Sequence, residues 1–273
     1  MQPETHRPHS WDPDRYLAYA DERSRPFVDL IAQIRATSPR TVVDLGCGPG
    51  NLTALLAARW PNADVLGLDS SPEMIATARA RADDVRYEQA DLREWIRTAQ
   101  GDPVDVVVSN ATLQWLPEHL DLLPGLVAAV RPGGWLAFQV PGNFEEPSHT
   151  IRRELAAEDA YAPHVEGVAH PSSHEPTAYL DALTRLGCEV NAWETTYLHV
   201  LDGTDDPDPV FTWVSATGAR PTLQALPADL RGTFEDEFRR RLALAYPVRA
   251  DGGVVLPFRR IFAVAQVPEG DRR

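Results

Sequence analysis

The chain has 273 residues, of which 43% are hydrophobic and 24% are charged, a composition typical of a globular protein and not of a disordered one. This length suits one large α/β domain, or a core domain with a modest second lobe. All 26 basic residues are arginine, which excludes lysine Schiff-base chemistry and a P-loop lysine, and the net charge of −14 disfavours nucleic acid and membrane surfaces as partners.

Apolar runs and helical patterns alternate through the first half of the chain. Strands are predicted over residues 42–45, 65–68, 85–89, 105–109 and 135–140. Helices are predicted over residues 26–34, around Leu52 to Leu56, after Ser71-Pro72, and over residues 120–130. Strands that alternate with helices in this way predict an α/β fold with a parallel sheet covered on both faces.

The second half of the chain does not continue the regular alternation of strands and helices. Loops containing Pro and His are predicted over residues 161–176, followed by a helix ending at Leu186, a polar strand over residues 189–200 and a closing strand over residues 261–267. Residues 202–253 are predicted to form a mostly helical excursion that acts as a lid, with an apolar stripe of Leu230, Phe234, Phe238 and Leu242. Residues 235–237 are acidic and residues 239–241 are arginines, which predicts a solvated, salt-bridged helix surface.

The strongest local motif is VVDLGCGPGN at residues 42–51, a strand that enters a glycine turn and then a helix. Gly46, Gly48 and Gly50 allow a sharp turn and close approach of a ligand, and the helix that follows offers free N–H groups. The dinucleotide fingerprint needs its third glycine where Asn51 stands, so the spacing favours S-adenosylmethionine over NAD. Asp69 ends the next strand, where a carboxylate can accept both hydroxyls of a ribose.

Two further loop positions suit the same ligand, because they follow the third and fourth predicted strands. Asp91 either accepts from an adenine amino group or caps the helix beginning at Leu92. Asn110 either lies beside the methionyl portion or is a turn residue.

Several other chemistries have no support in the sequence. A G-x-S-x-G elbow and an H-E-x-x-H motif are both absent, and Pro171 interrupts the pair His170 and His174, so no metal site is expected. Cys47 and Cys188 have no C-x-x-C spacing, which argues against a disulfide framework and a zinc ribbon. The N-terminal residues lack an apolar signal region and no 18-residue apolar run occurs, so we expect a cytoplasmic protein that is neither exported nor membrane-spanning.

The glycine loop and Asp69 together resemble the class I S-adenosylmethionine-dependent methyltransferases. Further motifs, spread over nearly the whole chain, resemble one bacterial branch of that family. They are WDPDRYL at Trp11, ERSRP at Glu22, Asp69 followed by SSPEMIA, SNATLQWLP at Ser109, EPSH at Glu146, WETTY at Trp193, WVSATGARP at Trp213 and PFRRIF at Pro257. The glycine loop is common to many methyltransferases, so the N-terminal and C-terminal motifs are the specific part.

This resemblance implies a Rossmann-like class I methyltransferase fold, with a mostly parallel seven-stranded sheet and helical insertions that cover the substrate. It implies that residues 1–26 close over the cofactor, that residues 27–141 form the cofactor-binding core, and that residues 142–273 complete the sheet and supply the lid. The implied reaction transfers a methyl group from S-adenosylmethionine to one carboxylate of the small tricarboxylate trans-aconitate. Its products are a monomethyl ester and S-adenosylhomocysteine.

The expected site binds and positions its ligands and has no acid or base catalyst, because a carboxylate is already ionised near neutral pH. Cofactor-binding residues are expected to be Asp44, Gly46, Gly48, Gly50, Asp69, Ser70, Asp91, Leu92, Asn110 and Arg25, with Arg23 the alternative to Arg25. Substrate-binding residues are expected to be Arg220, Arg260, Tyr197, Tyr246, His149 and Trp115, of which Trp115 and His149 lie nearest the reaction. A brace or packing role is the alternative for each substrate residue.

Three other functions stay open. A methyltransferase with the same core could act on another small carboxylic acid or on a natural-product hydroxyl, and a hydroxyl would need a base such as His149 or His119. A non-catalytic module that binds S-adenosylmethionine or a nucleotide is the second alternative. A nicotinamide oxidoreductase is the third, and Asn51 disfavours it.

Overall fold

The computed structural model describes residues 20–99 and 101–269, with side chains from residue 24 onward. The predicted N-terminal segment therefore lies mostly outside the described residues. No helix within the described ranges has the length and apolar character needed to cross a membrane.

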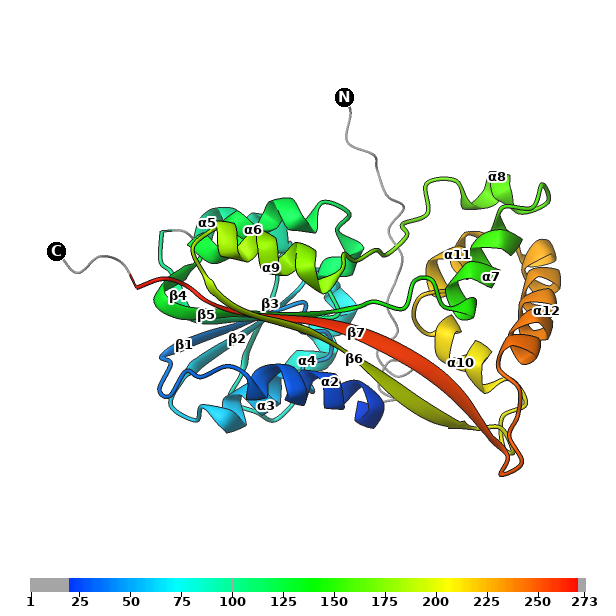
Figure 1. The fold of residues 1–273 in the computed structure, drawn as a ribbon, viewed down its shortest axis with the longest axis horizontal. Coiled ribbons are helices and arrows are strands. Elements are labelled where there is room, and N and C mark those ends of the chain that lie inside the picture. Colours follow the sequence, from blue (N-terminus) through cyan, green and yellow to red (C-terminus); the bar gives the residue numbers. More distant parts are fainter. Residues whose placement is uncertain (1–19, 100, 270–273) are drawn as a thin grey trace. The chain divides into compact units, whose positions relative to one another are not determined.

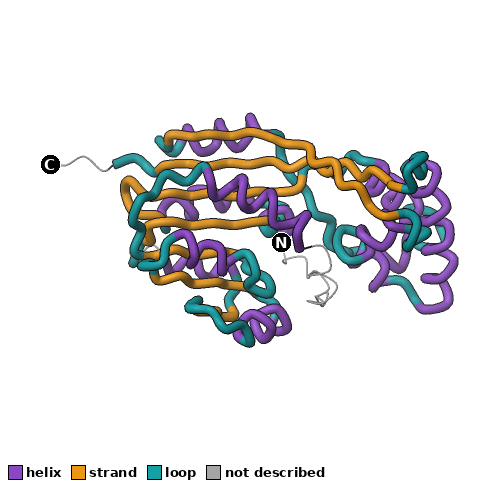
Figure 2. Tube along the Cα trace, turned by 90° about the horizontal axis from the view of Figure 1, so that it is seen from below, coloured by secondary structure: helices purple, strands orange, loops and turns teal. Residues whose placement is uncertain are grey.

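A seven-stranded sheet with the order β3-β2-β1-β4-β5-β7-β6 organises the fold (Figures 1 and 2). Neighbouring strands are parallel from β3 through β5, and β7 runs antiparallel to β5. The strands are β1 (Thr41–Leu45), β2 (Asp64–Asp69), β3 (Arg86–Gln89), β4 (Val104–Asn110), β5 (Val130–Pro141), β6 (Glu189–Asp202) and β7 (Gly253–Gln266). The predicted fold class, a Rossmann-like and mostly parallel seven-stranded sheet, is confirmed.

Helices cover both faces of the sheet (Figure 1). On one face lie α2 (Ala20–Ala32), α3 (Thr53–Arg59) and α4 (Pro72–Arg79), and on the other lie α5 (Leu92–Ala99), α6 (His119–Ala128) and α9 (Pro176–Arg185). The short 3-10 helix η1 (Leu113–Trp115) follows β4. Val43, Val107 and Phe138 from three strands pack with Leu123 of α6 and Tyr179 of α9 in one buried cluster. Burial on both faces explains the apolar runs at residues 42–43 of β1 and 106–108 of β4.

Local sequence fixes the helix starts that were predicted. Ser71 caps α4 by accepting a hydrogen bond from the Met74 N–H at 3.2 Å, and Pro72 occupies the first helical position. The N-cap residue therefore lies two residues after Asp69, the last residue of β2.

Several boundaries differ from the prediction, among them the starts of α2 at Ala20 and of β5 at Val130. Strand β7 begins at Gly253, not at residue 261. The sequence does not indicate its first half, because Pro257 and the arginines that follow are unusual in a strand. Helix α6 ends at Ala128, since Val130 already belongs to β5. Helix α8 (Ala162–Val165) lies inside the segment predicted as loop.

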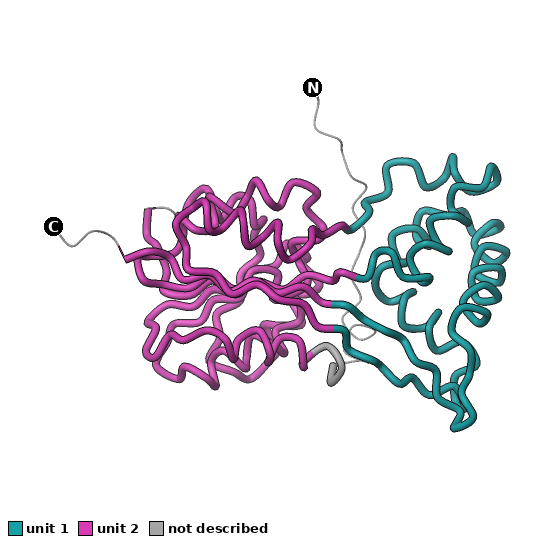
Figure 3. Tube along the Cα trace, viewed as in Figure 1, with its two compact units in different colours: residues 1–10, 143–171, 196–259 teal, residues 11–142, 172–195, 260–273 magenta. Residues whose placement is uncertain are grey.

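The chain divides into two compact units (Figure 3). Among the described residues, unit 2 comprises 20–142, 172–195 and 260–269, and it contains most of the sheet with its flanking helices. Unit 1 comprises residues 143–171 and 196–259. It contains α7 (Pro147–Ala156), α8, α10 (Pro209–Ser215), α11 (Arg220–Ala225) and α12 (Ala228–Ala245).

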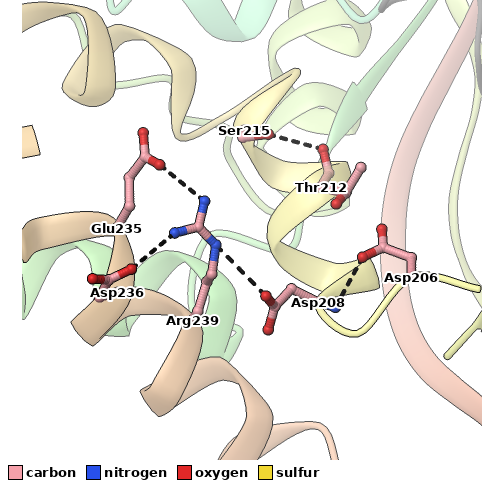
Figure 4. A network of polar contacts seen from close by, with 7 residues as sticks. All are labelled: Asp206, Asp208, Thr212, Ser215, Glu235, Asp236 and Arg239. Carbon is pink, nitrogen blue, oxygen red and sulfur yellow. Dashed lines mark hydrogen bonds and ion pairs between the residues drawn. The ribbon is translucent and has the colours of Figure 1, made fainter. Parts of the chain in front are cut away.

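Helix α12 shows the apolar stripe and the charged surface that the sequence predicts. Phe234, Phe238 and Leu242 are buried, whereas Leu230 is only half-buried. Arg239 pairs with Glu235 at 2.9 Å and with Asp236 at 3.3 Å, and its guanidinium also lies 3.6 Å from Asp208 of the segment before α10 (Figure 4). These partners balance the charge of Arg239, as expected for a salt-bridged helix surface.

Candidate active site

The glycine loop joins β1 to α3 at the carboxyl ends of the parallel strands. All three glycines have positive φ: 79° at Gly46, 55° at Gly48 and 80° at Gly50. The N–H groups of Gly46 and Cys47 both donate to the Leu68 carbonyl, at 2.7 and 2.9 Å. The loop is therefore fastened to the end of β2, and its shape requires residues without a Cβ.

The three glycines differ in what surrounds them. A Cβ at Gly46 would collide with the Thr112 side chain, and a Cβ at Gly50 would lie 2.7 Å from the ring of Tyr87. At Gly48 a Cβ would meet nothing within 4 Å. Gly46 and Gly50 thus serve packing within the protein, whereas the space beside Gly48 is open to a ligand.

Asp69 connects the glycine loop to the end of β2. Its Oδ2 accepts from the Gly48 N–H at 2.9 Å, and its Oδ1 accepts from the Ser71 N–H at 2.9 Å. Burial raises the pKa of Asp69, and the hydrogen bonds from Ser71 and Gly48 oppose this rise. Each oxygen retains a lone pair, so the carboxylate can still accept two hydroxyls.

Asp44 lies at the end of β1 and is 2% exposed. The Thr53 hydroxyl donates to its Oδ2 at 2.7 Å. Burial raises the pKa of Asp44 to about 7, the hydrogen bond from Thr53 lowers it, and the nearby charge of Asp69 adds to the rise. The site therefore contains a carboxylate whose charge a cationic ligand would stabilise.

Asn110 ends β4 on the same sheet edge. Its Oδ1 is buried and has no hydrogen-bond partner among the described residues. The next residue, Ala111, has φ 54°, which is unusual for a residue with a Cβ. An unpaired acceptor beside a strained backbone is typical of a residue held for a ligand.

The remaining predicted cofactor residues occupy varied positions. Asp91 is exposed, and its Oδ1 accepts from the Arg93 N–H at 2.7 Å, so its helix-capping role is observed and its contact with adenine stays a prediction. Leu92 begins α5 and is half-buried, while Ser70 and Arg25 are exposed. The side chain of Arg23 lies outside the description.

The predicted substrate residues belong to both units and are described within each. In unit 2, Arg260 is 6% exposed on β7 and Trp115 is half-buried in η1. In unit 1, Tyr197 is buried on β6 and Arg220 is half-buried at the start of α11. Burial of Arg260 and Tyr197 is compatible both with substrate binding and with packing.

His149 and Tyr246 occupy one region of unit 1. The Ser148 N–H donates to the Tyr246 hydroxyl at 3.0 Å, which fixes this tyrosine against the start of α7. The ring of His149 lies edge-on to Phe144 at 5.1 Å, and a Cβ on Gly218 would lie 2.8 Å from it. Burial lowers the pKa of His149 to about 3, with Arg152 and Arg153 lowering it further, so its imidazole is neutral near pH 7.

Arg152 is a candidate that sequence reasoning missed. It is 3% exposed, its Nη1 donates to the Thr222 hydroxyl at 2.8 Å, and its Nε has no hydrogen-bond partner among the described residues. In the sequence, nothing but its place beside Arg153 marks this residue. Only packing against α11 distinguishes it from exposed Arg153.

Metal ligands are not gathered anywhere within residues 20–99 and 101–269, since no group of three His, Cys, Asp or Glu side chains there could hold an ion. Cys47 and Cys188 are buried free thiols. Burial raises the pKa of both thiols, which makes them inert as nucleophiles near neutral pH.

Comparison with known proteins agrees with this geometry. The family model described as a methyltransferase domain matches residues 42–134, the segment that contains the glycine loop, Asp69 and Asn110. Together with the sheet order, this match defines a class I methyltransferase. The chain is also 49% identical to the trans-aconitate 2-methyltransferase of Streptomyces avermitilis, over 94% of this chain and 96% of that relative. The chain belongs to the trans-aconitate 2-methyltransferase family.

Solved structures resemble this chain in fold. The YcgJ protein of Bacillus subtilis has a TM-score of 0.56 at 13% identity, covering 90% of this chain and 99% of that one. Phosphoethanolamine N-methyltransferase 2 of Haemonchus contortus, solved in complex with S-adenosyl-L-methionine, has a TM-score of 0.51 at 15% identity, covering 90% of this chain and 53% of that one. At these identities the likeness concerns the fold alone.

The raised pKa of Asp44 leads to a stability prediction for Asp44→Asn. An unfolded Asp titrates near 3.9, so between about pH 4 and 7 the folded protein retains a proton that the unfolded chain has lost. The contribution of Asp44 to the unfolding free energy should fall across this window by at most about 1.4 kcal/mol per pH unit, and Asp44→Asn should lack this contribution.

Urea titrations at several pH values measure this difference. The advantage of Asp44→Asn over the wild type should grow from about pH 4 to 7 and then stay constant. Asp64→Asn, at the exposed start of β2, is the matched control and should follow the wild type. Parallel curves for the wild type and Asp44→Asn would contradict the raised pKa.

Proposed function

We propose that this chain transfers a methyl group from S-adenosylmethionine to one carboxylate of trans-aconitate, giving the monomethyl ester and S-adenosylhomocysteine. The observation that carries this proposal is the 49% identity to a named trans-aconitate 2-methyltransferase over 94% of this chain. The geometry of the site supports it independently, since one sheet edge supplies acceptors for a nucleoside cofactor, and Arg152 and Arg260 are buried cations of the kind that a polyanion needs.

The residues at the carboxyl edge of the sheet fit the cofactor. Gly48 leaves open space, Asp69 retains acceptor capacity for the ribose hydroxyls, and the buried Oδ1 of Asn110 needs a donor. The methionyl ammonium can supply that donor, and a bound cation favours the ionised form of Asp44 at the same edge. The bound cofactor supplies an electrophilic methyl group on a positively charged sulfur.

A tricarboxylate must lose its hydration shell to react, and only cationic and hydrogen-bonding partners make this feasible. We assign this work to Arg260 and Arg220, with Arg152 as a further buried cation, and to Tyr197, Tyr246, His149 and Trp115 as wall or donor residues. Arg260 at 6% exposure and Arg152 at 3% exposure are partly desolvated before any ligand binds. Such arginines bind carboxylates strongly because less water has to be displaced.

Positioning accounts for the chemistry. The nucleophile is a carboxylate ionised near neutral pH, so no proton has to be removed. Holding oxygen, methyl and sulfur in line at about 3 Å can contribute roughly 7 to 11 kcal/mol in favourable cases.

A hydroxyl acceptor would need a general base, and the structure disfavours both histidines considered for that role. Burial and two neighbouring arginines bring the pKa of His149 to about 3. His119 is fully buried and bonded through both ring nitrogens, at 2.7 Å each, to the Leu116 carbonyl and the Tyr179 hydroxyl. The site is therefore better suited to an acceptor that is already an anion.

Mass spectrometry tests the function directly. The purified protein is incubated with S-adenosylmethionine and, separately, trans-aconitate, cis-aconitate, isocitrate or citrate. We expect the monomethyl ester of trans-aconitate as the main product. No ester from trans-aconitate, with another acid or a hydroxyl compound methylated instead, would overturn the proposal.

Asp69→Ala tests the cofactor site. Loss of the carboxylate removes the acceptors for the ribose and releases the Gly48 N–H, so we expect binding of S-adenosylhomocysteine to weaken by roughly tenfold or more. Isothermal titration calorimetry measures this affinity. Asp64→Ala, at the exposed start of the same strand, should bind like the wild type. Equal affinities for Asp69→Ala and the wild type would remove Asp69 from the site.

Arg220→Ala and Arg260→Ala test the substrate site. Each should raise the KM for trans-aconitate by roughly tenfold or more, the loss expected for a charge-assisted hydrogen bond of about 1.5–3 kcal/mol. Affinity for S-adenosylhomocysteine should stay unchanged. Arg259→Ala is the control, since successive residues of β7 point to opposite faces. A wild-type KM in either arginine variant would exclude that residue.

A further inference from the structure

One face of the sheet has polar residues at its carboxyl edge, across neighbouring strands of unit 2. Gln139 of β5 is in register with Asn110 of β4 and with Phe262 of β7. Residues in register share a face, so the side chains of Asn110 and Gln139 lie on the same side of the sheet. Arg260 is two residues from Phe262 and pairs with Pro141, which places it diagonally from Gln139 on this same face.

The side chain of Gln139 is unusual for a residue of the packed core. It is fully buried, and neither its Oε1 nor its Nε2 has a hydrogen-bond partner among the described residues. Each unpaired buried polar atom lowers the stability of the folded protein. An apolar side chain at this position would make the folded protein more stable, so packing does not explain the amide.

The side chains around Gln139 are mostly apolar. Phe138 and Val140, on either side of it in β5, point to the opposite face and belong to the main apolar cluster. On its own face, Ala137 and Phe262 are fully buried, and Phe262 stacks on Trp193 at 4.7 Å with nearly parallel rings. The Gln139 backbone carbonyl accepts from the N–H of Ala111, the residue with positive φ, at 2.9 Å. This hydrogen bond holds Gln139 beside the end of β4.

The order of the polar groups across the strands suggests what the amide binds. Asp44 and the acceptor Oδ1 of Asn110 suit a cation, and the Arg260 guanidinium suits an anion. Gln139 lies between Asn110 and the strand that carries Arg260, and its amide offers one acceptor and one donor group. An amide here can therefore contact an anion next to a cationic methyl donor.

We propose that Gln139 binds the substrate carboxylate that receives the methyl group, with Nε2 donating to one carboxylate oxygen. This assignment rests on the proposed function and deepens it. The other oxygen then forms the O–CH3 bond as the methyl–sulfur bond breaks, the electron pair of that bond stays on sulfur, and no proton moves. A neutral amide orients the carboxylate without neutralising it, whereas an arginine at this position would reduce the reactivity of the oxygen.

Gln139→Met tests the assignment, because methionine keeps the length and most of the volume and removes both unpaired polar atoms. We expect its Tm to equal or exceed that of the wild type, and its affinity for S-adenosylhomocysteine to be unchanged. Its kcat/KM for trans-aconitate should fall at least tenfold. Gln139→Glu should lose at least as much, since it adds a negative charge beside the substrate.

Gln266→Met is the matched control on β7. Its Nε2 donates to the Gly133 carbonyl at 3.3 Å at the other end of the sheet, so this variant loses a hydrogen bond and should keep a wild-type kcat/KM. A lower Tm in Gln139→Met would mark a structural amide and overturn the assignment. Wild-type values of kcat and KM in Gln139→Met would overturn the assignment of Gln139 and leave the proposed function intact. If the wild-type protein does not methylate trans-aconitate, both the proposed function and this assignment are overturned.

Discussion

The hydrogen bond from the Gly48 N–H to Asp69 Oδ2 is the contact on which the cofactor edge depends. It joins the loop after β1 to the end of β2, at 2.9 Å, while the Ser71 N–H holds the other carboxylate oxygen at 2.9 Å. A single carboxylate thus fixes a glycine turn and the start of the helix that Ser71 caps. Because the fixed groups are backbone N–H groups, their positions are set before a ligand arrives, which lowers the entropic cost of binding.

The same edge concentrates groups that weaken the folded state. Asp44 is buried as a carboxylate, Ala111 has a positive φ, and Asn110 and Gln139 have unpaired buried amide atoms. On α12, by contrast, each arginine of residues 239–241 has acidic partners. A concentration of such groups at one edge of one sheet is typical of a functional site.

Hydrophobic periodicity and the turn residues between strands were enough to predict the sheet, because strands buried on both faces leave apolar runs such as residues 106–108. The glycine loop and Asp69 were likewise readable, since the turn accepts only particular residues. Strand β7 was predicted too short because Pro257 and Arg259 lie in a strand that tertiary pairing sustains. Gln139 and Arg152 were not predicted at all. Both side chains are buried with polar atoms that lack a hydrogen-bond partner among the described residues, and no local sequence pattern reveals this property of the packed fold.

The position of β7 has a consequence for how the protein is made. This strand is the last of the seven to leave the ribosome, and it lies between β5 and β6 in the sheet. The earlier strand β6 therefore has no sheet neighbour until residues 253–266 emerge, and residues 196–259 remain attached to an incomplete scaffold during that interval. Loss of this strand through a premature stop would expose apolar residues of β5 and β6 together, and quality-control proteases act on such surfaces.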